Sequence, residues 1–155
     1  MGEGKEFEVL IPDEAFQTLN FDQENFPGVA VVNINLATFE PKEVFGWNCS
    51  VILECEDTMD NGMPSKEESL IIDAFGDFLD DNIKGEDKEQ PNALFLARVT
   101  WKNTRQLIWR VFDLENVETY FADLTKKGTH KRSFDYSIDY DATWELTEWY
   151  LKDRG

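Results

Sequence analysis

The amino-acid sequence predicts an α+β protein with an antiparallel sheet, elements in βαββαβ order, an extra N-terminal strand and a C-terminal helix. Two observations lead to this prediction. Apolar residues alternate at strand spacing in two segments, two further segments are rich in β-branched and aromatic residues, and apolar residues recur at helical spacing between them. In addition, 155 residues with 41% hydrophobic and 14% aromatic side chains can form one core without disulfide or metal support.

The first strand of the pattern is Trp47–Cys55, in which apolar and polar residues alternate. Cys49 and Cys55 are six residues apart in this strand. An extended backbone separates them by about 20 Å, which is too far for a disulfide. We therefore expect two free thiols that pack in the core.

The first helix and a hairpin follow. Ser65 and Glu68 have the spacing of a capping box, and the helical apolar pattern that they precede ends near Ile83. After a charged linker, Ala93–Trp101 and Thr104–Phe112 are rich in β-branched and aromatic residues, with two residues between them. This arrangement predicts a tight β-hairpin.

The last part of the chain predicts a second helix, a strand and a closing helix. Asp113 is a suitable N-cap for the second helix, which we expect to stop at Gly128. Residues 133–140 alternate cleanly between polar and apolar side chains, as a strand does. Thr143–Lys152 then has the composition of a C-terminal helix.

Together these elements give the split βαβ arrangement of ferredoxin-like folds. In that topology the first and third strands are central and the second lies at an edge. Val29–Leu36 predicts the extra N-terminal strand, and Phe7–Ile11 is a second strand candidate. We divide the chain into an N-terminal segment, residues 1–24, which is a candidate for strand formation and packs on the domain, and a single α+β domain, residues 25–155.

Three motifs resemble a known family. They are Asp60–Glu68 before a helix, Ala97–Thr100 leading through a turn to Arg105, and an acidic residue shortly before Trp144. They resemble the bacterial family called domain of unknown function 695 (DUF695), over about residues 25–151. The resemblance implies a ferredoxin-like α+β fold and no particular activity. It also implies a distant fold-level similarity to type B regulators of ribonuclease E activity, which are acidic inhibitors.

Charge is distributed unevenly along the chain. Residues 1–97 contain 22 acids and 5 bases, whereas residues 98–155 contain 10 of each, which gives a net charge of −17. This charge repels nucleic acids and anionic membranes and favours a basic protein partner. A well-solvated acidic surface without a partner is the alternative. We expect a cytoplasmic protein, because the sequence shows no apolar membrane span and no signal peptide. We expect it to be a monomer or a homodimer.

The sequence contains few residues typical of catalysis. It has one histidine and two cysteines, and it lacks a nucleophile elbow and a glycine-rich phosphate loop. We therefore expect no catalytic residues, no metal and no cofactor. The prediction is a non-catalytic interaction or regulatory module whose basic partner is an RNA-processing enzyme or nuclease. The alternatives are a small acid–base enzyme that uses carboxylates such as Asp80, Asp139 or Asp141, and a purely structural oligomeric domain.

Basic and indole side chains alternate along the predicted hairpin. Guanidinium groups stack well on indole rings, so we take five residues as binding candidates: Arg98, Trp101, Arg105, Trp109 and Arg110. The alternative is that these bases form ion pairs with the acidic first half of the same chain.

Both faces of the predicted hairpin carry large apolar side chains. Leu94 and Leu96 are expected on the face opposite to Phe95, Ala97 and Val99. Helices cover only one face of a ferredoxin-like sheet, so another element must cover the second face. The candidates are residues 1–45, the helix around Trp144–Trp149, or a second copy of the chain.

Overall fold

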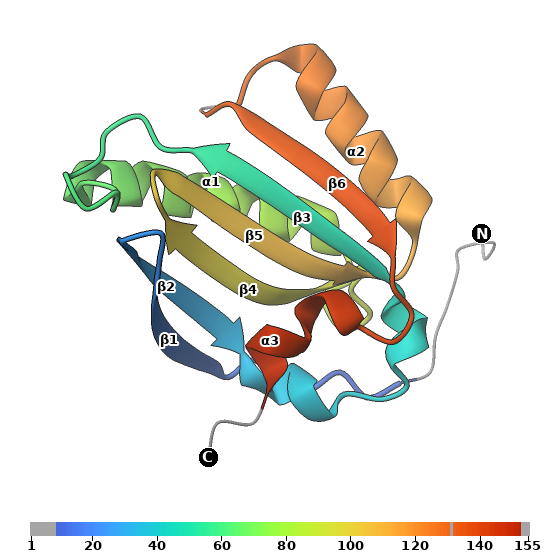
Figure 1. The fold of residues 1–155 in the computed structure, drawn as a ribbon. Coiled ribbons are helices and arrows are strands. Elements are labelled where there is room, and N and C mark those ends of the chain that lie inside the picture. Colours follow the sequence, from blue (N-terminus) through green and yellow to red (C-terminus); the bar gives the residue numbers. More distant parts are fainter. Residues whose placement is uncertain (1–8, 131, 153–155) are drawn as a thin grey trace.

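The computed structural model describes residues 9–130 and 132–152. A six-stranded antiparallel sheet with the order β1-β2-β4-β5-β3-β6 lies at its centre (Figure 1). Helices α1 and α2 lie behind the sheet in this view, and α3 lies in front of it. The predicted α+β class is confirmed. The strands and α-helices are β1 (Phe16–Gln23), β2 (Phe26–Asn33), β3 (Trp47–Glu54), α1 (Lys66–Lys84), β4 (Ala93–Trp101), β5 (Thr104–Val111), α2 (Leu114–Lys127), β6 (Phe134–Tyr140) and α3 (Glu148–Leu151).

The elements from β3 to β6 follow the predicted βαββαβ order. The expectation that the second strand of this series lies at an edge is wrong. That strand is β4, and its residues 97–101 pair with residues 28–32 of β2. The N-terminal strands therefore use the backbone groups that an edge strand would leave open.

Two N-terminal strands form instead of the single predicted one. β1 and β2 make a hairpin whose turn residues, Glu24 and Asn25, both have positive φ. β2 begins three residues before the predicted Val29–Leu36 strand and ends at Asn33, where a 3₁₀ helix, η1 (Ile34–Thr38), begins. In the strand candidate Phe7–Ile11, residues 7 and 8 lie outside the described part of the chain, and residues 9–11 are not a strand.

The helix boundaries follow from their caps. Ser65 Oγ accepts the N–H of Glu68 at 3.1 Å, as predicted for the first turn of α1. The reciprocal bond of a capping box is absent from these residues, because the Glu68 carboxylate accepts the N–H of Glu56 and a guanidinium instead. Asp113 caps α2, and Gly128 ends it in the left-handed conformation.

The sheet separates two hydrophobic cores. One core lies under α1 and α2 and contains the buried hydrophobic residues of β3, including Cys49. The other lies on the opposite face, where β2, β4, η1 and a second 3₁₀ helix, η2 (Lys42–Phe45), meet Trp144. Cys49 and Cys55 are free thiols, as predicted. Thus two of the three candidate covers, residues 1–45 and the segment around Trp144, contribute to the second core.

A β-bulge changes the face assignment in β4. The register between β4 and β5 shifts between Phe95 and Ala97. Because a bulge inserts one extra residue, alternation is reversed beyond it. Ala97 and Val99 therefore pack in the second core with Leu94, rather than on the side of Phe95 as expected.

The predicted Thr143–Lys152 helix is also corrected. Trp144 adopts a left-handed conformation with φ 63°, and a 3₁₀ helix, η3 (Glu145–Thr147), and the single turn α3 follow it. A right-handed helix cannot pass through such a residue. The Asp141 carboxylate accepts the N–H groups of Glu145 and Leu146 at 3.1 and 2.9 Å. These bonds fix the start of η3 at Glu145, two residues after the predicted helix start at Thr143.

Candidate functional site

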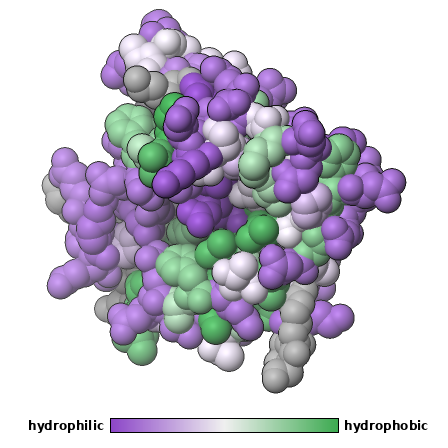
Figure 2. Space-filling view, turned by 90° about the vertical axis from the view of Figure 1, so that its left-hand side faces the viewer, coloured by the Kyte–Doolittle hydropathy of each residue, from purple (hydrophilic) through white to green (hydrophobic). Residues whose placement is uncertain are grey.

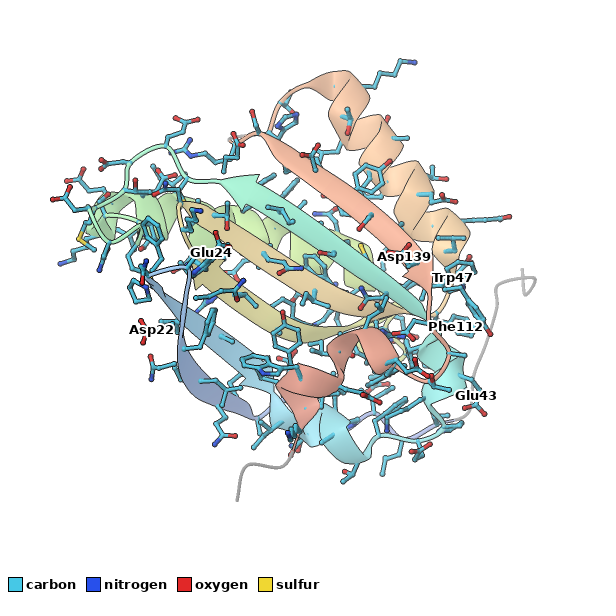
Figure 3. The ribbon with its side chains drawn as sticks, viewed as in Figure 1. Asp22, Glu24, Glu43, Trp47, Phe112 and Asp139 are labelled. Atoms are coloured by element: carbon cyan, nitrogen blue, oxygen red, sulfur yellow. The ribbon has the colours of Figure 1, made fainter. Side chains whose placement is uncertain are left out.

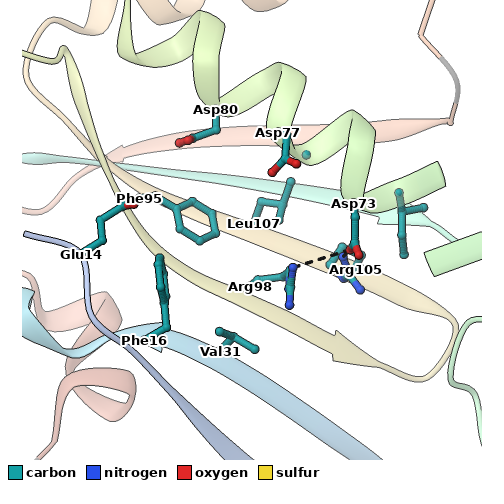
Figure 4. Close-up of a pocket in the computed structure, with 12 residues that line it drawn as sticks. Glu14, Phe16, Val31, Asp73, Asp77, Asp80, Phe95, Arg98, Arg105 and Leu107 are labelled. Atoms are coloured by element: carbon teal, nitrogen blue, oxygen red, sulfur yellow. Dashed lines mark hydrogen bonds and ion pairs between the residues drawn. The ribbon is translucent and has the colours of Figure 1, made fainter. Parts of the chain in front are cut away.

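A cleft of about 340 Å³ opens between α1 and the strands beside it (Figure 4). The helix-side core is formed mainly by α1, α2, β3 and β5, whereas β1 and β2 lie toward the other edge of the sheet. The cleft lies where side chains of α1 face side chains of β1, β2, β4 and β5. We call it the α1 cleft, and its lining consists of Glu14, Phe16, Val31, Ile72, Asp73, Gly76, Asp77, Asp80, Phe95, Arg98, Arg105 and Leu107.

Helical spacing places three carboxylates on the wall of the α1 cleft. Asp73, Asp77 and Asp80 are four and three residues apart, so they lie on one face of α1. Gly76 lies on the same wall opposite Leu107. A Cβ atom at Gly76 would be 3.4 Å from Leu107 Cδ1. The absent side chain therefore keeps this part of the cleft open.

Two arginines share one carboxylate of this wall. Arg105 Nη1 donates to Asp73 Oδ1 at 2.7 Å, and Arg105 Nε donates to Thr100 Oγ1 at 2.9 Å. Arg98 Nη1 lies 3.6 Å from the same Asp73 oxygen. Burial lowers the pKa of Arg105, an effect that the Asp73 carboxylate opposes. Arg105 is thus an anchored core residue, while the Arg98 side chain remains 39% exposed.

Asp80 closes the other end of the wall. It accepts the indole N–H of Trp109 at 2.8 Å and forms an ion pair with Lys84 at 3.0 Å. Lys84 also reaches Glu14 at 3.1 Å. Burial alone would lower the pKa of Lys84, but the two carboxylates raise it above its usual value. This ion-paired group ties the N-terminal segment to α1.

Asp77 differs from its two neighbours. Its side chain points toward the cleft (Figure 4) and is exposed. Within residues 9–130 and 132–152, its carboxylate has no ion pair and no hydrogen bond. Below it lie the apolar side chains of Val31, Phe95 and Leu107. The cleft therefore offers an uncompensated negative charge above an apolar floor.

The structure does not bring the five predicted binding residues together. Arg98 and Arg105 line the α1 cleft, and Trp109 is fully buried beneath it. Trp101 and Arg110 belong to the opposite face of the sheet. Trp101 Nε1 donates to the carbonyl of Gln23 at 3.0 Å.

Arg110 is inaccessible to a partner. Its side chain is 0% exposed, and it donates to Asp141 Oδ2 and to Asn48 Oδ1, both at 3.1 Å. Its guanidinium carbon lies 4.9 Å from the ring centroid of Trp144. Burial lowers the pKa of Arg110, and Asp141 opposes that shift. The guanidinium–indole contact of Arg110 is thus made inside the second core with Trp144, rather than with Trp101 or Trp109 of the hairpin as the sequence suggested.

The other cations near the hairpin also form ion pairs within the chain. Lys102 pairs with Glu24 at 3.2 Å. Arg132, before β6, pairs with Glu68 and lies 3.5 Å from Glu56. His130 Nδ1 lies 2.9 Å from the carbonyl of Arg132. These contacts agree with the internal-pairing alternative for the basic residues.

The carboxylates named for acid–base chemistry do not share a site. Asp80 lies in the α1 cleft, and Asp141 is bound to Arg110 and to backbone N–H groups on the other face. Figure 3 shows Asp139 near Trp47 at one end of the sheet, with Asp22 and Glu24 at the other end. Among the described residues, no group of three or more His, Cys, Asp or Glu side chains is arranged to hold a metal ion.

The surface in Figure 2 is mainly hydrophilic, with separate hydrophobic patches around a hollow. None of the described helices combines the length and apolar character required to cross a membrane. The candidate site residue that the sequence analysis did not name is Asp77. Its signal was the four-residue spacing from Asp73 along one side of a predicted helix.

Comparisons with known proteins give one match. The model of a family described as a family of unknown function, DUF695, matches residues 18–151. No curated protein and no solved structure gave a match.

Proposed function

Because the chain belongs to the DUF695 family, whose function is unknown, we propose its function from the surface itself: a non-catalytic interaction or regulatory module that binds a basic protein. The observation that supports this proposal is the exposed Asp77 carboxylate, which has no partner among residues 9–130 and 132–152 and lies beside cations that are already paired. Arg98 and Arg105 share Asp73, and Lys84 is held by Asp80 and Glu14. The charge left for a partner is therefore negative.

The α1 cleft suits a lysine or arginine side chain of that partner. Val31, Phe95 and Leu107 provide an apolar floor for the methylene groups of such a side chain. Phe16 and Phe95, whose ring centroids are 6.2 Å apart, offer aromatic faces to a cation. Asp77 at the wall then supplies the opposite charge. A carboxylate ligand would meet more acids than bases here.

The rest of the molecule assists the approach of a basic partner. The whole net charge of −17 arises from residues 1–97, and this asymmetry orients the encounter and raises its rate. Proteins that act on RNA carry basic surfaces because they must contact phosphates. An RNA-processing enzyme or nuclease in the cytoplasm is therefore the partner class that we propose.

Affinity capture from native lysate tests this function. We compare the wild type with Asp77→Asn and with Asp135→Asn, an identical change at an exposed position of β6. We expect Asp77→Asn to weaken capture of a basic protein severalfold and Asp135→Asn to leave it unchanged. Capture should also fall as the Debye length shrinks from about 10 Å at 0.1 M salt to about 3 Å at 1 M.

Two results would contradict the proposal. One is capture that does not change with salt, because docking of exposed charges must weaken when they are screened. The other is an equal effect of the two substitutions, which would mean that only the total charge matters.

A further inference from the structure

The outer surface of α1 carries two parallel rows of side chains. Leu70, Ala74 and Phe78 form an apolar row at four-residue spacing, and Leu70 and Phe78 are 66% and 50% exposed. Asp73, Asp77 and Asp81 form an acidic row at the same spacing, three residues further along the helix. Rows offset by three residues are neighbours on a helix surface.

The apolar row continues into a groove on the side of α1 away from the cleft. This groove of about 500 Å³ lies between α1 and the end of α2, and its lining includes Ile71, Phe75, Leu124 and His130. Ile71 is 39% exposed. Contiguous exposed apolar side chains of this kind mark interaction surfaces more often than isolated ones do.

We propose that this face of α1 binds an amphipathic helix of the basic partner. The apolar side chains of that helix would fill the groove and pack on the row from Leu70 to Phe78. Its lysines or arginines would reach Asp77 in the acidic row, because Asp73 is already paired with Arg105 and Asp81 with Lys88 at 2.9 Å. An α-helix presents side chains at the same three- and four-residue spacings, so its ridges match these rows. The inference rests on the proposed function in taking the partner to be basic.

Charge argues against a second copy of the chain as the occupant. Two copies that met through this face would place acidic rows next to each other, with a net charge of −17 on each molecule. Like charges at the rim of an interface oppose association. A basic helix instead brings a positive charge to Asp77, beside the apolar row, on a molecule with a net charge of −17.

Two synthetic peptides of about 18 residues, long enough to hold a helix when bound, test the inference. Both contain only leucine and lysine in equal proportions. In the first, leucines recur at three- and four-residue spacing, and in the second the same residues are shuffled so that no helical stripe exists. Fluorescence anisotropy of each labelled peptide measures its affinity for the full chain.

We expect the striped peptide to bind at least about tenfold more tightly than the shuffled one, a difference of about 1.4 kcal/mol. Leu70→Gln should weaken its binding about tenfold by removing apolar contact area. Leu146→Gln, at a residue 57% exposed on the opposite face, is the matched control and should have no effect. Because Leu70 is so exposed, the variant should also keep the wild-type melting temperature.

Three other outcomes would contradict the inference, and each of them points to a different cause. Equal affinity for both peptides would mean that only charge is recognised, which leaves the proposed function standing. Failure of both peptides at low salt would overturn the helix site and weaken the proposed function too. A wild-type dimer that Leu70→Gln converts to a monomer in sedimentation would show that a second copy covers this face.

Discussion

Arg132, in the loop before β6, donates from Nε to Glu68 Oε2 at 2.8 Å, across 64 residues of sequence. Glu68 is only 1% exposed although it lies in the first turn of α1. It also accepts the N–H of Glu56 at 2.8 Å. One carboxylate therefore joins the loop after β3, the start of α1 and the loop before β6.

This contact predicts an acid-dependent loss of stability. The hydrogen bond from Arg132 lowers the pKa of Glu68. A carboxylate whose pKa is lower in the folded state contributes stability above its unfolded pKa, about 4.3. That stability decreases as the pH falls below this value toward the folded pKa, because the unfolded state binds the proton more readily. Urea unfolding between pH 7 and pH 3 should show a smaller acid slope for Glu68→Gln than for the wild type.

Arg110 predicts a large loss of stability on truncation. Arg110→Ala removes the cation that Asp141 and Asn48 bind in the second core and leaves Asp141 unpaired at 9% exposure. Breaking such a buried pair costs about 3–5 kcal/mol. Arg98→Ala, at a 39% exposed side chain, is the control and should cost about 1 kcal/mol or less. Similar losses for the two variants in urea titration would contradict this assignment.

Gly76, on the wall of the α1 cleft, is a position where substitution should raise stability, in contrast to Arg110→Ala. The Cβ atom of Gly76→Ala would meet Leu107 at an ordinary contact distance of 3.4 Å. Alanine in a helix interior is favoured over glycine by about 0.5–1 kcal/mol. We therefore expect Gly76→Ala to raise the urea midpoint. A lowered midpoint would mean that the wall cannot accommodate even one methyl group.

Gly28 predicts a clash across the N-terminal hairpin. It lies opposite Phe21, and a Cβ atom there would be 2.1 Å from Phe21 Cζ. The ring also packs edge-on against Trp149, with a centroid distance of 5.9 Å. Because the Phe21 ring would have to move, we expect Gly28→Ala to lower the free energy of unfolding by about 1–2 kcal/mol. In a Phe21→Ala background the same change should cost much less, which a double-mutant cycle measures.

The two thiols should differ in reactivity. Burial raises the pKa of Cys49 to about 12, and it also raises the pKa of Cys55, which is partly exposed. Because the thiolate is the reactive form, iodoacetamide at pH 8 should modify Cys55 slowly and Cys49 only after unfolding. Mass spectrometry of the labelled peptides checks the order. Labelling of Cys49 first would contradict the burial of this face of β3.

The sequence was sufficient where local signals agree with the tertiary structure. The two-residue turn between β4 and β5 and the glycine that ends α2 mark boundaries that the structure confirms. β1 could not be located within the N-terminal segment because its residues are mostly polar and exposed, and its turn, Glu24-Asn25, lacks glycine. The bulge at Phe95 arises from strand register, a property of two segments rather than one.

The candidate site could be predicted only in part. Charge and aromatic content identified Arg98 and Arg105, which do line the α1 cleft. The same rule also selected Arg110 and Trp109, which are buried. A strand alternates its side chains between faces, so neighbours in sequence became members of different layers. Asp77 could not be selected from the sequence, because the cleft that it faces exists only where β2 lies near α1 in the folded sheet.

The contact of Trp144 with η2 has a consequence for the order in which parts of the chain can fold. The Trp144 indole donates to the carbonyl of Phe45 at 3.0 Å, and its ring stacks on Phe39 at 5.6 Å. Contacts of such long sequence separation slow folding, since the loop between them must close first. During synthesis on the ribosome, Phe39 and Phe45 emerge about a hundred residues before their cover. The native contacts of these aromatic rings with Trp144 can therefore form only after nearly the whole chain has been synthesised.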